Sequence, residues 1–561
     1  MMIRYTKKQR FLTLAAVGAL SLAACSSGGG SNAAATDENA TLIAYTGQAG
    51  DYQSNYNPYS PSQIGGIGSI FEPLFFFNQL RTGEPQPLLG TEYAWNDDGT
   101  VLSITTRENV TWSDGEPFTA KDVAFTLNML KENPSVNQIG FDAEVELVDD
   151  THLVLTFPVV SFVEGPEVLG RAPIVPEHLW ADLDPATDMQ ASPVGTGPFT
   201  LKEFKPQAYT LTANPDYWGG EAAVKNIRFL SLSGNQAGAQ GLSAGSIDWQ
   251  TGPVPNMDDI EGNYPGYKGI TYHMNQMALF TCSNAALGCE GPQTDPAVRK
   301  ALYYAMDREQ LNALAFQNTA SEISPGFALP DRDKEILSKD LEEQLAPMTP
   351  SVETASSLLE AAGYAKGSDG IYAKDGVRVA MSVRVPTGWT DYITALDLIA
   401  EQARAAGIEI TSQQSSWNEW SEVRGTGEYE LLIDALLQGA SADPYYMYAN
   451  HFSTVNTNPV GTAATPNYSR FSNSEVDASL ESLRTLSPDD SEARQPYYDT
   501  IQRVIVEDMP YIPIMTGGTT SEYNAEKFEG WPTKDDLYAI PAIWSSPDNA
   551  RIFYTLKPAG E

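Results

Sequence analysis

The chain has 561 residues, of which 42% are hydrophobic, and a formal charge of −38 at pH 7. This length predicts ~3 to 4 domain-sized units, and the composition is that of a folded chain with an ordinary apolar core. The acidic balance excludes a nucleic-acid-binding protein, because such proteins present basic surfaces to their ligand.

The first 24 residues have the layout of a secretory signal. Basic residues crowd the first ten positions, and the apolar run 11–24 that follows is shorter than the ~20 residues that span a bilayer. Leu22-Ala23-Ala24-Cys25 resembles the bacterial lipoprotein box, in which the cysteine is acylated and becomes the new N-terminus. We therefore expect lipidation at Cys25, a flexible tether over 25–40, and an extracytoplasmic chain held at the outer face of the bacterial cell membrane.

Strand and helix patterns alternate from the first third of the chain onward. Residues 100–110 read as a strand entered through the turn 96–99. A helix is predicted to follow at 119–130, with Thr119 as its N-cap and Asp122 three residues later.

The two remaining cysteines, Cys282 and Cys289, predict a small disulfide loop. Six residues separate them, and thiols outside the cytoplasm tend to oxidise. A zinc site, the alternative, needs three or four nitrogen or sulfur ligands, and the nearest histidine in the sequence is His273. No metal site is therefore expected.

The second half of the chain repeats the helix–strand scheme. Helices are predicted at 295–306, capped by Asp295, at 351–362 and at 391–406 with a stop at Gly407, and a hairpin is predicted to turn at Asp375-Gly376. A long helix at 491–508 breaks before Pro510 and leads into a last strand. The alternation at 391–414 indicates an α/β lobe with a mostly parallel sheet, and the whole chain is predicted to be a mixed α/β protein of several lobes.

The sequence contains no recognisable catalytic motif. Four histidines, at 152, 178, 273 and 451, have no ligand spacing, and none of the common nucleophile, zinc or phosphate-loop motifs occurs. A pair of carboxylates acting as in glycosidases stays possible in so acidic a chain, so a secreted hydrolase is retained as a distant alternative. We otherwise expect no enzyme and no cofactor.

Aromatic residues in one C-terminal region are the better candidates for a ligand pocket. They fall in or beside predicted loops, and each could equally be a packing residue. The group consists of Trp389, Trp417, Trp420, Tyr445, Tyr446 and Tyr448.

Several motifs in a fixed order resemble the family 5 extracellular solute-binding proteins of ABC importers, the group that contains oligopeptide and dipeptide binders. The resemblance runs from about residue 42 to the C-terminus. It rests on NPYSPS (from 57), IFEPLFFFN (70), RENVTWSDGEPFTAKDVAFTL (107), PIVPEHLW (173), PVGTGPFTL (193), NPDYWGG (214), LSAGSIDW (242), DPAVRKALYYAMDRE (295) and LLEAAGY (358).

The resemblance implies a two-lobed type II periplasmic-binding-protein clamshell with an additional N-terminal subdomain. Lobe I is expected from 41–60, 190–270 and 511–561, the subdomain from 61–189, and lobe II from 271–510. A monomer would catch a short oligomer outside the cell, close over it, and deliver it unaltered to the transmembrane subunits of an ABC permease.

The resemblance also proposes ligand-binding residues. Asp443 matches the aspartate that pairs with a peptide's ammonium, Trp417 matches a tryptophan that lines a side-chain pocket, and Gln53 and Ser54 lie in the stretch that pairs with the ligand backbone. Two features depart from the peptide binders: about four extra residues precede Asp443, and Ile433 and its neighbours lack a basic side chain for the ligand carboxylate.

Two ligand classes therefore remain open. Residues 386–400, 459–471 and 530–542 look like a subgroup that binds β-linked oligosaccharides, which stack on aromatic rings and need no charged partner. A short peptide is the first expectation and such an oligosaccharide the second. An adhesion or purely structural surface protein is the remaining alternative.

Overall fold

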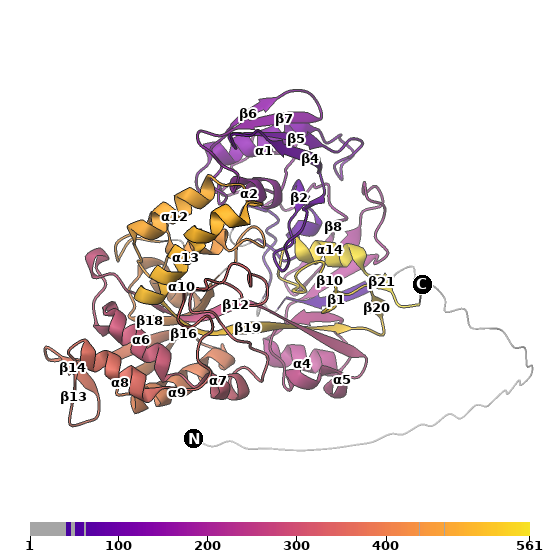
Figure 1. Cartoon of the computed structure of the whole chain (residues 1–561). Coiled ribbons are helices and arrows are strands. Elements are labelled where there is room, and N and C mark those ends of the chain that lie inside the picture. Colours follow the sequence, from indigo (N-terminus) through magenta and orange to yellow (C-terminus); the bar gives the residue numbers. More distant parts are fainter. Residues whose placement is uncertain (1–40, 47–50, 61–62, 437, 465, 561) are drawn as a thin grey trace, which may run out of the picture.

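In the computed structural model of this chain, the structure describes residues 41–46, 51–60, 63–436, 438–464 and 466–560. The predicted signal, the lipidation site Cys25 and the tether lie outside the described residues. Figure 1 shows three parts: an N-terminal subdomain at the top, lobe I at the right and lobe II at the left.

One twisted sheet of ten strands runs through both lobes. The strand order is β17-β16-β18-β12-β19-β11-β1-β10-β9-β8. In that order the strands are β17 (Glu409–Ser415), β16 (Ala380–Pro386), β18 (Leu431–Leu436), β12 (Tyr267–Thr281), β19 (Tyr511–Asn524), β11 (Trp249–Thr251), β1 (Thr41–Tyr45), β10 (Asn226–Leu230), β9 (Ala208–Ala213) and β8 (Phe199–Lys205).

The parallel pairing predicted for the lobe with the helix–strand alternation is present where β16 pairs with β17 and with β18, but it does not extend over the whole sheet. Among the described residues, four neighbouring pairs are parallel, namely β1 with β10 and β11, and β16 with β17 and β18. The other five are antiparallel. The reason is that β12 and β19, the long strands that join the lobes, run against each other and against their outer neighbours. A local alternation of helices and strands does not reveal such a pairing.

Lobe II places its helices around strands β16 to β18 and the adjoining ends of β12 and β19, as Figure 1 shows. The helices are α6 (Pro296–Ala305), α7 (Arg308–Leu314), α8 (Val352–Ala361), α9 (Thr390–Ala405), α10 (Trp417–Thr426), α11 (Tyr445–Phe452), α12 (Ser474–Arg484) and α13 (Ser491–Asp508), with the short elements η3 (Ala285–Leu287), η4 (Pro292–Thr294), η5 (Thr454–Asn456), β13 (Ala365–Lys366), β14 (Tyr372–Lys374) and β15 (Val377–Arg378). A disulfide joins Cys282 to Cys289.

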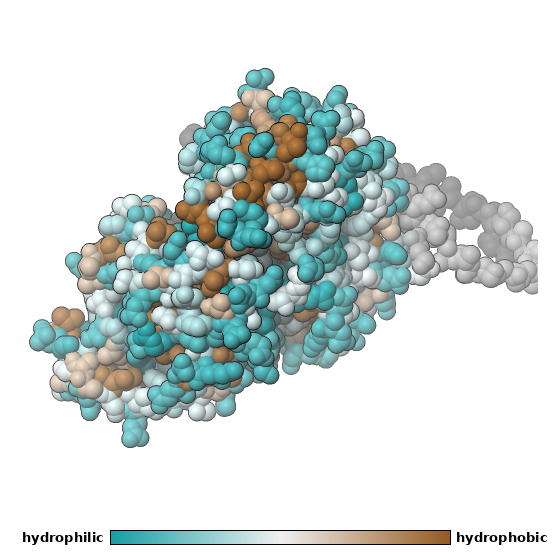
Figure 2. Space-filling model, turned by 45° about the horizontal axis from the view of Figure 1, so that its top comes forward, coloured by the Kyte–Doolittle hydropathy of each residue, from teal (hydrophilic) through white to brown (hydrophobic). Residues whose placement is uncertain are grey.

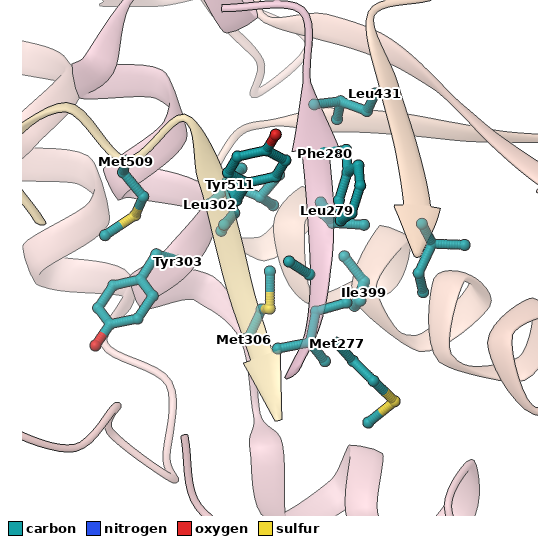
Figure 3. Packing of buried hydrophobic residues seen from close by; sticks show 14 of the residues in the cluster. Met277, Leu279, Phe280, Leu302, Tyr303, Met306, Ile399, Leu431, Met509 and Tyr511 are labelled. Atoms are coloured by element: carbon teal, nitrogen blue, oxygen red, sulfur yellow. The ribbon is translucent and has the colours of Figure 1, made fainter. Parts of the chain in front are cut away.

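The core of lobe II is a single apolar cluster. Figure 3 shows Leu279 and Phe280 of β12 close to Tyr511 of β19, with Leu302 of α6 and Met306, the residue after α6, beside them. Because both long strands contribute to this cluster, lobe II packs as one unit on its own half of them.

Lobe I and the N-terminal subdomain share a second apolar cluster. Lobe I adds α4 (Asn235–Ser243), η2 (Met257–Asp259), α5 (Ile260–Asn263), β20 (Phe528–Glu529), α14 (Asp548–Thr555) and β21 (Lys557–Pro558). The subdomain has η1 (Ile67–Ser69), β2 (Phe75–Phe76), β3 (Gln86–Pro87), β4 (Gly90–Trp95), β5 (Val101–Thr106), α1 (Ala120–Glu132), β6 (Glu144–Leu147), β7 (His152–Thr156), α2 (Glu164–Gly170) and α3 (Glu177–Trp180). The shared core makes these two parts one body.

A two-stranded ribbon joins that body to lobe II. Within the described chain, β18 pairs with β12 from Gln276 onward, and β11 pairs with β19 from Ser521 onward. Between these points β12 and β19 pair with each other, with a β-bulge between His273 and Asn275 opposite Gly517 and Gly518. This narrow ribbon, with its bulge and two glycines, is the candidate hinge between the two bodies and is called the hinge below.

The surface is largely hydrophilic on the face in Figure 2, where brown residues gather mainly on the subdomain. Over the described ranges, no helix is both long and apolar enough to cross a membrane.

Candidate functional site

The carboxyl ends of several strands face the hinge from both lobes. In lobe II, β18 ends beside Gln276 and β16 runs parallel to it. In lobe I, β1 and β11 end beside the start of the hinge at Ser521. Open α/β sheets bind ligands in crevices at the carboxyl ends of their strands, so the space around the hinge is the candidate site.

A large cleft of about 1010 Å³ lies along the hinge. This volume is at the upper end of the ~300–1,000 Å³ of small-molecule sites, so it can hold a short oligomer. Both lobes, the hinge and the subdomain contribute to it. The lining residues are Gln79–Thr82, Met257–Glu261, Gly269, Thr271–His273, Gln317–Thr319, Ser321, Leu329–Arg332, Thr516, Thr520, Lys534 and Leu537.

Polar side chains of the hinge form the floor of the large cleft. The hydroxyls of Thr271 and Thr520 lie 2.8 Å apart, and Nε2 of His273 lies 2.9 Å from the carbonyl oxygen of Thr319. The Thr516 hydroxyl donates to the Glu322 carbonyl at 2.7 Å. The first contact joins the two hinge strands, and the other two connect them to the lobe II segment 319–322.

The walls of the large cleft carry opposite charges. Asp258, Asp259 and Glu261 of lobe I are exposed on one side. Arg81 of the subdomain and Lys534 of the C-terminal segment supply positive charge on another. Arg81 pairs with Asp536 at 3.1 Å, and both side chains are about half exposed or more, so solvent screens this pair and leaves the cation available.

Lobe II contributes a further acid but no free cation to the described part of this lining. Asp331 is exposed, whereas the buried guanidinium of Arg332 is paired with Asp333 at 2.6 Å. Tyr272, which is 3% exposed, is the one Phe, Trp or Tyr residue among the described lining residues.

Several contacts cross from lobe II to the other body. The Asn256 amide donates to the Gln317 side chain at 3.1 Å, and Arg332 donates to the Gln79 carbonyl at 3.1 Å. An apolar cluster brings Tyr272 and Met274 of the hinge together with Leu80, Leu329, Ile540 and Ala542. These contacts hold the two bodies against each other at the rims of the large cleft.

Asp443 already has two strong partners within lobe II. Its carboxylate accepts from Arg494 at 2.6 Å and from the Tyr498 hydroxyl at 2.6 Å. The Arg494 side chain is only 4% exposed. A ligand ammonium at Asp443 would therefore compete with a buried guanidinium, and Asp443 is absent from the described lining of the large cleft.

The predicted tryptophans partly come together. Trp389 and Trp420 pack with their ring centres 5.2 Å apart, Trp420 being 1% exposed. The Arg424 guanidinium covers the Trp420 ring and pairs with Asp434 at 2.6 Å, while burial raises the pKa of Asp434. Trp417 begins α10, and its side chain is outside the described part of the structure.

The other predicted residues lie on two further segments. Tyr446 is 4% exposed, and its hydroxyl donates to the Val163 carbonyl of the subdomain at 2.7 Å. Gln53 is exposed and Ser54 half-buried, in a lobe I segment fixed where the Tyr52 amide donates to Pro206. None of these residues lines the large cleft.

A second, small pocket of about 180 Å³ brings the lobe I segment after Tyr56 to the lobe II segment that leads to Asp443. Pro58 and Tyr59 lie on one side of it and Ala440 on another. These two segments are therefore neighbours, although Gln53, Ser54 and Asp443 are not among the lining residues of the small pocket.

Sequence reasoning missed every residue that lines the large cleft. Three of the positions at its rim, Asn256, Gln317 and Asn318, have left-handed backbones with φ of 57°, 50° and 57°. Such values are uncommon outside glycine and mark local constraint, but the sequence gives no sign of them. Across the described residues, no group of three or more His, Cys, Asp or Glu could hold a metal ion.

Comparisons with known proteins agree with this architecture. Residues 84–459 match the family described as "Bacterial extracellular solute-binding proteins, family 5 Middle". Protein XP55 of Streptomyces lividans is 28% identical over 431 residues, covering 74% of this chain and 73% of that protein. The oligopeptide-binding protein AppA of Bacillus subtilis is 24% identical, covering 80% and 81%.

A solved structure from Thermotoga maritima matches over 93% of this chain and 99% of that one, with a TM-score of 0.81 and 22% identity. It is described as a mannohexaose-bound oligopeptide ABC transporter, periplasmic oligopeptide-binding protein. The match confirms the predicted type II periplasmic-binding-protein fold.

Proposed function

The chain belongs to the family 5 bacterial extracellular solute-binding proteins, and we propose that it captures short peptides for an ABC importer by closing its lobes. The observation that carries the proposal is the large cleft, which draws its walls from both lobes, the hinge and the subdomain. A ligand that touches both bodies stabilises the closed arrangement because it makes its full contacts only there.

The charges of the large cleft favour a peptide. A short peptide has an ammonium at one end and a carboxylate at the other, and its backbone can be held with little regard to side chains. Asp258, Asp259 and Glu261 are candidates for the ammonium, and Arg81 and Lys534 for the carboxylate. Asp443 remains the ammonium-binding residue that the sequence predicts. A ligand ammonium there would have to compete with Arg494 and Tyr498, which already bind its carboxylate.

A β-linked oligosaccharide is the second candidate ligand. Sugar rings bind aromatic faces, and Trp389, at the carboxyl end of β16, packs on Trp420 while remaining partly exposed. The described lining of the large cleft itself offers only Tyr272. This scarcity of rings places the peptide first.

The membrane attachment completes the proposal. Acylation of Cys25 and a tether through residue 40 would hold the receptor near its permease. Lobe I and lobe II would each present a surface to one transmembrane subunit when closed, and the ligand would leave chemically unaltered. Release of the intact ligand separates this function from that of a secreted hydrolase.

A melting-temperature screen tests the proposal. The mature chain is heated with di- to hexapeptides and with cello-, xylo- and manno-oligosaccharides, because a ligand of the folded state raises the melting temperature by mass action. We expect a rise with peptides, and loss of that rise when the peptide N-terminus is acetylated. A rise with oligosaccharides alone would establish the second candidate, and recovery of cleaved ligand would contradict both.

A further inference from the structure

The subdomain and lobe II meet at a second place, away from the hinge. Figure 1 shows α2 of the subdomain next to α12 of lobe II near the top of the molecule, whereas the hinge strands β12 and β19 lie lower. The Arg484 guanidinium at the end of α12 pairs with the Glu164 carboxylate at the start of α2, with 3.4 Å between Nε and Oε1. The Nη2 atom of Arg484 donates to the Ser161 hydroxyl at 3.4 Å. This contact joins the same two bodies as the hinge does.

Tyr446 of α11 adds a buried hydrogen bond to this contact. Its hydroxyl donates to the Val163 carbonyl at 2.7 Å, and the two residues are 4% and 2% exposed. When the bodies separate, water can reach both groups, whereas each group needs the other when the bodies meet. Ser161, Val163, Glu164, Tyr446 and Arg484 are together called the clasp below.

The subdomain half of the clasp is held in place by partners within the subdomain. The Ser161 amide donates to the Gly99 carbonyl at 2.7 Å, and the Glu164 amide donates to the Ser161 carbonyl at 2.9 Å. The Phe162 ring packs against Trp95, with 5.6 Å between the ring centres. The segment 161–164 therefore keeps its shape when lobe II moves.

The lobe II half of the clasp is equally well ordered. Tyr446 lies on α11, and Arg484 ends α12, a helix that is capped by Asn473 and packs on both α11 and α13. Arg484 is a cation in the last turn of its helix and Glu164 an anion in the first turn of its own, so each charge is favourably placed before the two meet. Forming the clasp therefore costs little free energy for ordering either side.

The clasp is also weak enough to open again. The Arg484 and Glu164 side chains are 23% and 26% exposed, so solvent weakens their attraction. The bond from Tyr446 to Val163 is a single hydrogen bond between uncharged groups, whose net contribution is modest. Such contacts bias a conformational equilibrium without making one state permanent.

We propose that the clasp holds the two bodies together from the side away from the hinge and so sets how readily the receptor closes and releases its ligand. The inference rests on the lobe closure of the proposed function and adds residues that control it. A contact made in the closed arrangement shifts the equilibrium toward that arrangement whether or not a ligand is present. If the free chain is mostly open, losing the clasp weakens ligand binding. If the free chain is mostly closed, losing the clasp makes it expand.

The test reverses each charge of the clasp and then exchanges the two. Glu164→Arg and Arg484→Glu each place like charges together, whereas the double variant restores an opposite pair in reversed order. Two quantities are measured: the calorimetric dissociation constant of trialanine, and the radius of gyration of the chain without peptide. We expect each single variant to bind trialanine at least about threefold more weakly or to have a larger radius, and the double variant to recover most of that change. Tyr446→Phe, which removes one hydroxyl, should change the same quantity in the same direction.

Glu475→Arg is the matched control, because Glu475 lies on the same helix, α12, and pairs at 2.6 Å with Arg503 of α13 within lobe II. This variant should change neither the affinity nor the radius. Melting of each variant without peptide establishes that it is folded.

Two outcomes would overturn the clasp and leave the proposed function intact. In the first, both single variants keep the affinity and the radius of the natural chain. In the second, the double variant recovers none of the change. Failure of the natural chain to bind trialanine, whose backbone and two ends carry the proposed contacts, would contradict the proposed function, and the radius alone would then decide the clasp.

Discussion

At the scale of single residues, burial decides what the charged groups can do. Asp443 and Arg494 form a nearly buried pair, whereas Glu475 and Arg503 form a pair of the same length, 2.6 Å, in which the side chains are 60% and 43% exposed. Removing one partner of the first pair should lower the free energy of unfolding far more, because water cannot reach the remaining buried charge and replace the lost partner.

Asp443→Asn should therefore lower the free energy of unfolding by roughly 3–5 kcal/mol, measured by urea denaturation. Glu475→Gln is the exposed control and should cost less than about 1 kcal/mol. Asp443→Asn could instead be no more destabilising than the control and yet weaken peptide binding tenfold. That result would show that Asp443 is the ammonium site that the sequence predicts and that its pair with Arg494 contributes little to stability.

Glu72 makes stability depend on pH. It is buried between Tyr217 and Trp218, which donate to its two oxygens at 2.8 and 3.1 Å, and burial raises its pKa to about 7. Because this pKa lies above the 4.5 of a free glutamate, the folded chain binds the proton more tightly than the unfolded chain. The stabilisation is complete below about pH 4.5 and is lost as pH rises through about 7.

Glu72→Gln should remove this dependence. Between about pH 5 and pH 8 we expect the natural chain to lose up to roughly 3 kcal/mol more unfolding free energy than the variant. Burial also raises the pKa of Asp548 to about 6. Asp548 is present in both proteins, so its contribution to the pH dependence of stability is the same in each. Equal losses in the variant and the natural chain would show that Glu72 is ionised throughout.

At the scale of elements, local sequence signals predicted the helices. They did not predict how strands far apart in the sequence pair. Thr119 with Asp122 forms the predicted capping box of α1, and Asp295 caps α6. These signals lie within a few residues of each other, so the sequence displays them directly. The pairing of β12 with β19 joins segments more than 230 residues apart. The sequence of neither strand indicates which other strand it pairs with.

The hinge itself offers an element-scale test. A Cβ at Gly518 would lie 1.9 Å from the Thr319 carbonyl oxygen, so Gly518→Ala must push the lobe II segment away from the hinge. We expect the variant to bind peptide at least tenfold more weakly, about 1.4 kcal/mol, with the loss mainly in faster dissociation.

Gly425→Ala is the control for this change. A Cβ added at Gly425 of α10 would meet open space, with no heavy atom from outside its own helix within 4 Å. Peptide affinity should be unchanged in this variant. Unaltered dissociation in Gly518→Ala would show that closure does not depend on the close approach of Gly518 to Thr319.

At the scale of the whole molecule, the family and the fold could be predicted, whereas the large cleft, the candidate site, could not. The family and the fold were predicted from motifs that occur in a fixed order along the chain. The large cleft instead arises where loops around residues 80, 258, 318, 331 and 534 meet. Each loop is ordinary in sequence, and only the packing of two bodies on a shared hinge makes a site of them.

Burial also bears on the aromatic residues that the sequence predicts as ligand contacts. Trp420 and Tyr446 are predicted as ligand rings, yet both are nearly fully buried in packing roles. Large rings contribute much buried area to cores, so their presence beside predicted loops does not distinguish a pocket from packing. Charged and small polar residues of the cleft form no comparable pattern.

Small-angle X-ray scattering of the mature chain, with and without saturating peptide from the melting screen, tests the closure mechanism most directly. We predict that the radius of gyration falls on binding, because the peptide draws lobe II toward the other body about the ribbon of β12 and β19. A radius that stays constant while calorimetry shows the peptide bound would contradict capture by lobe closure.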